Sequence, residues 1–226
     1  VEFATAPRRP DPRQVARFLR TSAPIGGQWL LDMLSFALFS SIVARMGDAE
    51  MAASQAMIQL LSLSFMQAVA ISVSAGTLVG RYLGAGDPAA AARSYASAMK
   101  LAMVLAAIVA ALFLCAPELL MRLFSADVQV LGLSRPLLQL GAFFQIVDAI
   151  GIVAGGSLRG GGDTRWPFLV HATLAWAARL PFVWALAVWL EGGVFGAWLG
   201  ELGYITLLGL AFVLRFRAGK WKTVRL

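Results

Sequence analysis

Four ionisable residues lie within long apolar stretches of the sequence: Asp32, Asp148, Arg179 and Glu201. A charged side chain in apolar surroundings is costly. Where it persists, it usually marks a proton or ion pathway, or it is paired with an opposite charge. Carboxylates suit proton transfer and cation binding, and a guanidinium suits pairing with carboxylates. The sequence therefore directs the search for function to these four residues.

Asp32 and Asp148 are predicted to lie at nearly one level, close to the middle of a membrane. Counted from the helix ends expected on the inner side, their depths are about 16 and 14 Å at 1.5 Å per residue. On neighbouring helices the two acids would share a site, where like charge and loss of water favour binding of a cation. H⁺ and Na⁺ are the candidate ions, and no other metal or cofactor is predicted. The alternative is that both carboxyl groups are protonated and only bond neighbouring helices.

Polar neighbours predict a cavity beside the two acids. Gln28 and Ser35 share a helix face with Asp32, four residues before it and three after it, and Gln145 precedes Asp148 by three. Helical spacing alone does not separate a cavity wall from ordinary packing, particularly for aromatic residues. The predicted cavity-lining residues are Gln28, Ser35, Phe36, Gln55, Gln59, Phe144 and Gln145.

Arg179 and Glu201 are predicted to form a structural ion pair. They lie about 11 and 8 residues from the outer ends of consecutive spans, so adjacent antiparallel helices bring them within about one turn of each other. The alternative partner for Arg179 is Asp148. His171 lies about one turn into its span, where a single histidine favours interfacial hydrogen bonding over metal binding.

Composition indicates that these residues are positioned by membrane helices. The 226 residues are 59% hydrophobic and 14% charged, with a mean hydropathy of +0.75 and one cysteine. These values argue against a water-soluble fold, a disordered chain and a disulfide scaffold. Six apolar stretches are each long enough to cross a hydrocarbon core of about 30 Å. We therefore predict an all-α polytopic membrane protein with spans near 21–45, 51–80, 91–115, 131–157, 166–190 and 193–215.

The positive charges predict how these spans are oriented. If residue 1 lies inside, 15 of the 19 Lys and Arg residues fall in inner segments and three in outer ones, a strong positive-inside bias. Both ends are then cytoplasmic, in a bacterial inner membrane. The expected parts are a basic amphipathic segment over 1–20, a helical lobe over 21–215 and a basic tail over 216–226. The net charge of +7 is thereby assigned to the lipid bilayer and not to nucleic acid.

Glycines and small residues predict two inner loops and close helix packing. Residues 84–87 and 160–163 each combine glycines that end one helix with an aspartate expected to cap the next. Neither loop has the pattern of a phosphate-binding loop. Lines of small residues spaced by four are typical of tight contacts between membrane helices. They are Ala68, Ser72, Gly76 and Gly80, then Gly151 and Gly155, then Gly192, Gly196 and Gly200.

Several stretches resemble the multidrug and toxic compound extrusion (MATE) transporters, in particular the bacterial NorM-type branch. Residues 83–87, LGAGD, resemble the inner loop after the family's eighth helix. Residues 158–165, LRGGGDTR, resemble the loop between its tenth and eleventh helices. Further matches run in order along the chain, so the resemblance covers nearly all of it.

The resemblance implies a transporter of twelve helices in two lobes, of which this chain is the C-terminal six-helix lobe. It implies multidrug efflux: export of small organic cations in exchange for H⁺ or Na⁺, with an N-terminal lobe as partner. In the NorM-type branch the cation-binding acids of this lobe fall on Asp32, where Glu is common, and on Asp148. Phe144 stands where Tyr is often found, which removes an oxygen ligand and favours H⁺ over Na⁺.

Other functions stay open at this point. A lipid-linked precursor flippase of the same superfamily is expected to have a more positive cavity, and a non-transporting interaction subunit also fits six helices. An intramembrane serine protease would need a motif such as GxSxG, but Arg159 replaces the final glycine after Ser157. We therefore predict that the chain is not an enzyme. The absence of an initial Met favours a piece of a longer chain over a natural half-transporter.

Overall fold

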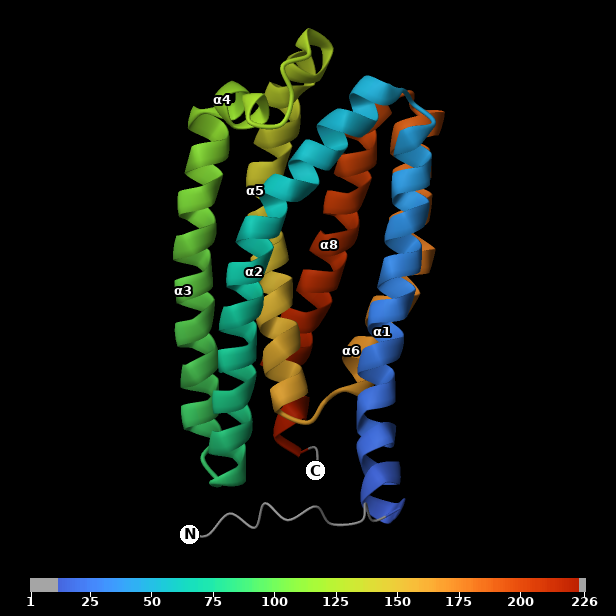
Figure 1. The fold of residues 1–226 in the computed structure, drawn as a ribbon. Helices are drawn as coiled ribbons and strands as arrows, with labels where there is room; N and C mark the ends of the chain where they lie inside the picture. Colours follow the sequence, from blue (N-terminus) through green and yellow to red (C-terminus); the bar gives the residue numbers. More distant parts are fainter. Residues whose placement is uncertain (1–11, 224–226) are drawn as a thin grey trace, which may run out of the picture.

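The computed structural model describes residues 12–223, and every regular element in that part of the chain is a helix (Figure 1). The prediction of an all-α fold is therefore confirmed. In chain order the elements are α1 (Pro12–Ala44), α2 (Asp48–Gly84), α3 (Pro88–Cys115), α4 (Pro117–Arg122), α5 (Val128–Gly160), α6 (Arg165–Leu174), η1 (Ala175–Arg179), α7 (Leu180–Trp184), η2 (Ala185–Trp189), α8 (Gly193–Arg217) and η3 (Lys220–Thr223).

Five helical stretches are long and apolar enough to cross a membrane. They are α2, α3, α5, the combined stretch Arg165–Trp189, and α8, and they match the second to sixth predicted spans to within four residues at each end. The first predicted span lies in α1, whose apolar portion is Trp29–Ala44. α1 begins and α8 ends at the same end of the bundle (Figure 1). The chain is therefore a multi-pass membrane protein.

Two predicted boundaries need correction. From residue 12 onward the expected basic segment over 1–20 and the first expected span are one element, because α1 runs from Pro12 to Ala44 without a break. Residues 1–11 of that segment lie outside the described part of the chain. After α8 the chain turns back in η3, where Trp221 is buried, stacks on Phe216 and donates its indole N–H to the Phe216 carbonyl at 2.7 Å. The predicted tail therefore begins with residues that pack against α8.

The two glycine loops have the same backbone feature, but their aspartates act differently. Gly86 and Gly162 have φ angles of 74° and 86°, in the left-handed region that glycine tolerates. Asp87 caps α3 as predicted, because it accepts a hydrogen bond from a backbone N–H of the first turn at 2.8 Å. Asp163 is buried and accepts from Nε of Arg215 at 2.8 Å, and it makes no cap to α6. The prediction of a second capping aspartate is wrong, and this carboxylate ties the loop to the end of α8.

α5 is the central helix of the bundle and packs against α2, α3 and α8. The small residues allow backbones to touch. A Cβ added to Gly76 would lie 2.8 Å from the carbonyl oxygen of Gly156, and one added to Gly80 would lie 2.8 Å from that of Gly160. On α8, a Cβ at Gly200 would meet the backbone of α7 at 2.7 Å. Such contacts hold these helices at a definite spacing.

Candidate functional site

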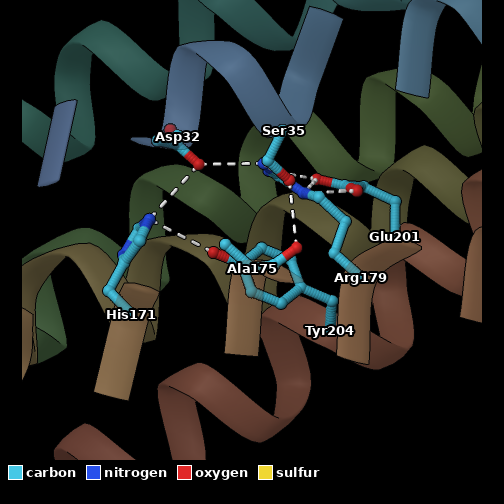
Figure 2. Close-up of polar contacts among 7 residues, drawn as sticks. All are labelled: Asp32, Ser35, His171, Ala175, Arg179, Glu201 and Tyr204. Atoms are coloured by element: carbon cyan, nitrogen blue, oxygen red, sulfur yellow. Dashed lines mark hydrogen bonds and ion pairs between the residues drawn. The ribbon is translucent and has the colours of Figure 1, made fainter. Parts of the chain in front are cut away.

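Arg179 is the centre of a buried polar cluster to which α1, α6, η1 and α8 contribute (Figure 2). Its Nε donates to both carboxylate oxygens of Glu201, at 3.0 and 2.9 Å, and its Nη2 donates to Oε1 at 2.6 Å. Both residues are almost fully buried. A contact of this kind balances two charges where water is excluded. Arg179 and Glu201 thus lie in the contact that helix depth predicts, whereas a purely structural role for them stays a prediction.

α1 brings Asp32 and Ser35 to the same guanidinium. Nη1 of Arg179 donates to Oδ1 of Asp32 at 2.9 Å and to Oγ of Ser35 at 3.3 Å. The Ser35 hydroxyl donates in turn to the backbone carbonyl of Ala175 at 3.0 Å, which joins α1 to η1. Two acids from different helices therefore share one arginine.

His171 and Tyr204 complete the cluster. Nε2 of His171 lies 3.2 Å from Oδ1 of Asp32 and 3.2 Å from the hydroxyl oxygen of Tyr204 (Figure 2). The buried Tyr204 ring lies against the Arg179 guanidinium, whose central carbon is 4.4 Å from the ring centroid, a cation–π contact. The Asp32 side chain is 30% exposed and that of His171 is 13% exposed. Asp32 is thus the most accessible charged member of the cluster.

The helix that carries His171 and Arg179 departs from α-helical geometry at the site. These residues are eight positions apart, and at about 100° per residue a regular α-helix would turn them about 80° from each other. From Ala175 to Arg179 the chain forms the π-helical segment η1, whose i→i+5 bonds widen the turn. Pro181 follows shortly after and lacks an N–H for the carbonyl of residue 177. Both side chains thereby reach the same oxygen atom of Asp32.

Asp148 on α5 lies beside this cluster without a hydrogen bond to it. Its side chain is half-buried, and among the side chains that the structure describes none donates to it. It lies close enough to Glu201, Asp32 and Arg179 to interact electrostatically with each. The two acids that the sequence singles out are therefore in one electrostatic neighbourhood, and three carboxylates act on one guanidinium.

Three of the predicted cavity residues pack inside the bundle. Gln145 is buried and donates from Nε2 to the carbonyl of Ala106 at 3.1 Å. It therefore joins α5 to α3, and its assignment to a cavity wall stays a prediction. Phe144 packs edge-on against Trp198 with ring centroids 5.6 Å apart. Phe36 lies near the cluster, since the Arg179 guanidinium carbon is 5.9 Å from its ring centroid.

Of the other predicted cavity residues, Ser35 belongs to the hydrogen-bonded cluster. Gln55 and Gln59 are exposed on α2, one turn apart. Gln28 belongs to α1, but its side chain lies outside the described part of the structure. Among the described residues no three His, Cys, Asp or Glu side chains form a group that could hold a metal ion. Na⁺ binding at Asp32 and Asp148 stays a prediction.

Sequence reasoning did not place His171 and Tyr204 in this site. Tyr204 follows Glu201 by three residues and therefore shares its face of α8, a signal that was available. For His171 the eight-residue spacing to Arg179 gives a weaker signal, because a regular α-helix turns those positions about 80° apart. Its place depends on the π-helical turn.

Comparison with known proteins identifies the family. The sequence pattern of the MatE family matches residues 24–185, a range that includes Asp32, Asp148, His171 and Arg179. The chain belongs to the MatE family. This MatE chain is 30% identical over 204 residues to a probable multidrug resistance protein NorM of Thermotoga maritima, and 32% identical over 210 residues to one of Rhodopseudomonas palustris. The matches cover 90% and 91% of the chain but 44% of each relative.

The fold agrees with that membership. A crystal structure of MATE in the straight conformation has a TM-score of 0.85 to this MatE chain, with 16% identity, and the match covers 96% of the chain and 49% of that structure. At this identity the likeness concerns the fold alone. The chain spans about half the length of the relatives it matches, as expected for one lobe of a transporter, and the MatE family is one of transporters and not of enzymes.

Proposed function

We propose that this chain forms the C-terminal lobe of a multidrug efflux antiporter that exports small organic cations in exchange for H⁺. An N-terminal lobe would supply the other wall of the transport cleft, in a bacterial inner membrane with both ends of this lobe cytoplasmic. Membership of the MatE family and the similarity to NorM proteins support efflux as the activity. The charges of the polar cluster support the substrate class and the ion.

The observation that carries this proposal is an excess of carboxylates. Asp32, Glu201 and Asp148 lie near a single guanidinium, that of Arg179. When all four groups are ionised, the site keeps a negative charge that apolar surroundings make costly. A proton or an organic cation each offsets one of the two excess negative charges. Two ligands that compete for the same charge bind in alternation, which is the requirement for exchange.

Hydrogen bonding at Asp32 favours H⁺ over Na⁺ as the coupling ion. Oδ1 of Asp32 accepts a bond from Arg179 and also lies against His171. Na⁺ would need oxygen ligands that are not taken by such donors, and Phe144 offers none. Asp148 has no donor among the described side chains, and it is the acid to which we assign the coupling proton.

The variant Asp148→Asn tests this assignment in the protein that contains both lobes. Asparagine keeps the shape of the side chain but cannot ionise, so we expect pH-driven export of tetraphenylphosphonium from reconstituted vesicles to be lost while thermal stability stays near wild type. Asp127→Asn is the matched control, because Asp127 is exposed and caps α5, a role that asparagine also fills. Full export by Asp148→Asn under a measured pH gradient would overturn the assignment.

Asp32→Asn is predicted to weaken export as much as Asp148→Asn, or less. The substitution removes one charge beside Arg179, but Glu201 still holds the guanidinium through two of its nitrogens. Initial export rates of the two variants, compared at equal amounts of reconstituted protein, measure the difference. A larger loss at Asp32 would transfer the coupling role to that residue.

The same vesicles separate the alternative functions. Export that follows a Na⁺ gradient and ignores a pH gradient would make Na⁺ the coupling ion. Movement of an anionic lipid-linked precursor, without movement of organic cations, would favour a flippase. No transport at all by the protein with both lobes would favour an interaction subunit.

A further inference from the structure

One nitrogen atom of His171 has two hydrogen-bond partners that differ in chemistry. Nε2 lies 3.2 Å from Oδ1 of Asp32 and 3.2 Å from the hydroxyl oxygen of Tyr204 (Figure 2). An imidazole nitrogen either carries a proton and donates, or carries a lone pair and accepts. An ionised carboxylate only accepts, whereas a hydroxyl does either. The protonation state of Nε2 therefore decides which of the two bonds is strong.

Each state of His171 ties α6 to a different helix. With a proton on Nε2, the imidazole donates to Asp32 on α1, and the Tyr204 oxygen can only accept from it. With a lone pair on Nε2, the hydroxyl of Tyr204 on α8 donates to the imidazole. The ionised Asp32 then receives no hydrogen bond from Nε2 of His171 and keeps its hydrogen bond from Arg179.

Charged groups face His171 from each of the elements packed around it. Asp32 lies on α1, Arg179 on η1, and Glu201 and Tyr204 on α8. Asp148 acts on the same group of charges from α5. With three carboxylates and one guanidinium, a second positive charge stabilises the cluster. The imidazole is a neutral member of the cluster that can gain one by binding a proton.

We propose that His171 is a proton-binding residue of the transport site, and that its proton and the exported organic cation replace each other as the second positive charge of the cluster. The inference rests on the proposed function and adds a histidine to the acids that the resemblance to MATE transporters implies. A proton from water binds the imidazole lone pair, and the imidazolium pairs with Asp32. When the cation arrives, that proton returns to water. Asp32, with 30% of its side chain exposed, is where both are expected to enter.

Nuclear magnetic resonance of the two-lobe protein, labelled with ¹⁵N in histidine, tests the proposal directly. His171 is the single histidine of this chain, and its signal is the one lost in His171→Gln. The ¹⁵N shifts of its ring are followed as a function of pH. Saturation with tetraphenylphosphonium should move the midpoint to lower pH by about one unit or more, because competition between two ligands is reciprocal. A signal that does not titrate, or whose midpoint ignores the cation, would overturn the proposal.

Binding measurements give a second and independent readout. At pH values below the midpoint of the ¹⁵N signal, proton binding to His171 should lower the wild-type affinity for tetraphenylphosphonium. The expected fall is about tenfold for each pH unit of acidification. In His171→Gln the fall should be much smaller, because glutamine keeps a donor and an acceptor but cannot gain a charge. An unchanged pH profile in that variant would sink the proposal even if its affinity were lower.

Tyr204→Phe tests the exchange of partners. Tyr204→Phe removes the hydroxyl donor and keeps the contact with Asp32, which favours a proton on Nε2 of the neutral imidazole. The ¹⁵N shifts report the tautomer. Tyr82→Phe, on α2 outside the cluster, is the matched control. A neutral imidazole in Tyr204→Phe with its proton on Nδ1 would contradict the partner exchange.

Failure of this inference is distinguishable from failure of the proposed function. If the wild type exports tetraphenylphosphonium under a pH gradient but the His171 signal ignores the cation, only the histidine role fails. If the His171 signal responds to the cation but no gradient drives export, the cluster binds cations and the antiport proposal fails.

Discussion

At the scale of single residues, the polar cluster is arranged around the buried charge of Arg179. Arg179 is 5% exposed and uses three nitrogens to donate to Glu201, Asp32 and Ser35. A guanidinium does not lose its charge in proteins, so its acceptors have to come from the fold. The acids around it are therefore unequal. Glu201 pairs with Arg179, Asp32 is shared with His171, and Asp148 accepts no hydrogen bond from a described side chain.

Removal of one member of the Arg179–Glu201 pair is predicted to destabilise the protein strongly. Arg179→Met and Glu201→Gln each leave a buried charge with fewer partners, at a cost of about 3–5 kcal/mol by precedent. The double variant should lose less stability than the two single variants added together. Each single variant leaves its partner's charge without this counter-charge, whereas the double variant removes both charges. Melting temperature in detergent measures this, with Arg122→Met as control because Arg122 is exposed on the short helix α4. Melting temperatures like that of the wild type in both single variants would mean that the pair is not structural.

At the scale of helices, two kinds of irregularity position the site. Glycines let α5 contact α2 through backbone atoms, and the π-helical turn η1 before Pro181 turns Arg179 toward α1. Loss of either would displace side chains by more than a hydrogen bond tolerates. Small residues and a proline therefore matter here for where the polar side chains point.

The α2–α5 contact predicts that two glycine substitutions on α5 differ in their effect on stability. A Cβ at Gly160 would overlap the backbone of Gly76, whereas a Cβ at Gly132 would meet nothing within 4 Å. Gly160→Ala should therefore destabilise by about 1–3 kcal/mol through overpacking. Gly132→Ala should be neutral or stabilise by up to about 1 kcal/mol through helix propensity. Equal melting temperatures for the two variants would show that α2 and α5 are not in backbone contact.

At the scale of the whole molecule, the outer surface is apolar and the polar cluster lies to one side of the central helix. Large apolar side chains are exposed on α1, α2, α3 and α8, which suits contact with lipid and with a second lobe. The chain spans 44% of the NorM relative from Thermotoga maritima and 48% of the one from Pseudomonas putida. A cleft between two lobes would therefore have one of its walls here.

This chain alone is predicted not to transport. In the proposed transporter this chain supplies one wall of a cleft between two lobes, so on its own it is not expected to pass a bound cation across the membrane. The test is reconstitution of the chain in vesicles with tetraphenylphosphonium under a pH gradient, beside the protein with both lobes as positive control. Gradient-driven export by the single lobe, with no dimer seen by crosslinking, would refute the prediction.

The sequence by itself determined the class of protein, the helical spans and four of the ionisable residues that lie together in the bundle. Apolar runs of more than 20 residues have few folded alternatives, because backbone groups in lipid have to be bonded within one helix. Asp32, Asp148, Arg179 and Glu201 stood out for the related reason that charge is costly in such runs. Even the contact of Arg179 with Glu201 followed from counting depth along adjacent helices.

Only the tertiary structure decided how these residues share their bonds. The rotation of a helix about its own axis depends on packing against several other helices at once. That rotation decides which of two polar neighbours faces inward. Gln145 shares a face with Asp148 in sequence yet bonds to α3, and Asp163 bonds to Arg215 in place of a helix end. His171 reaches Asp32 because a local π-helical turn changes the angle between positions eight apart. The helical period and the depth of a residue are properties of a single helix. The hydrogen-bond partner of a side chain depends instead on how all the helices of the bundle pack together.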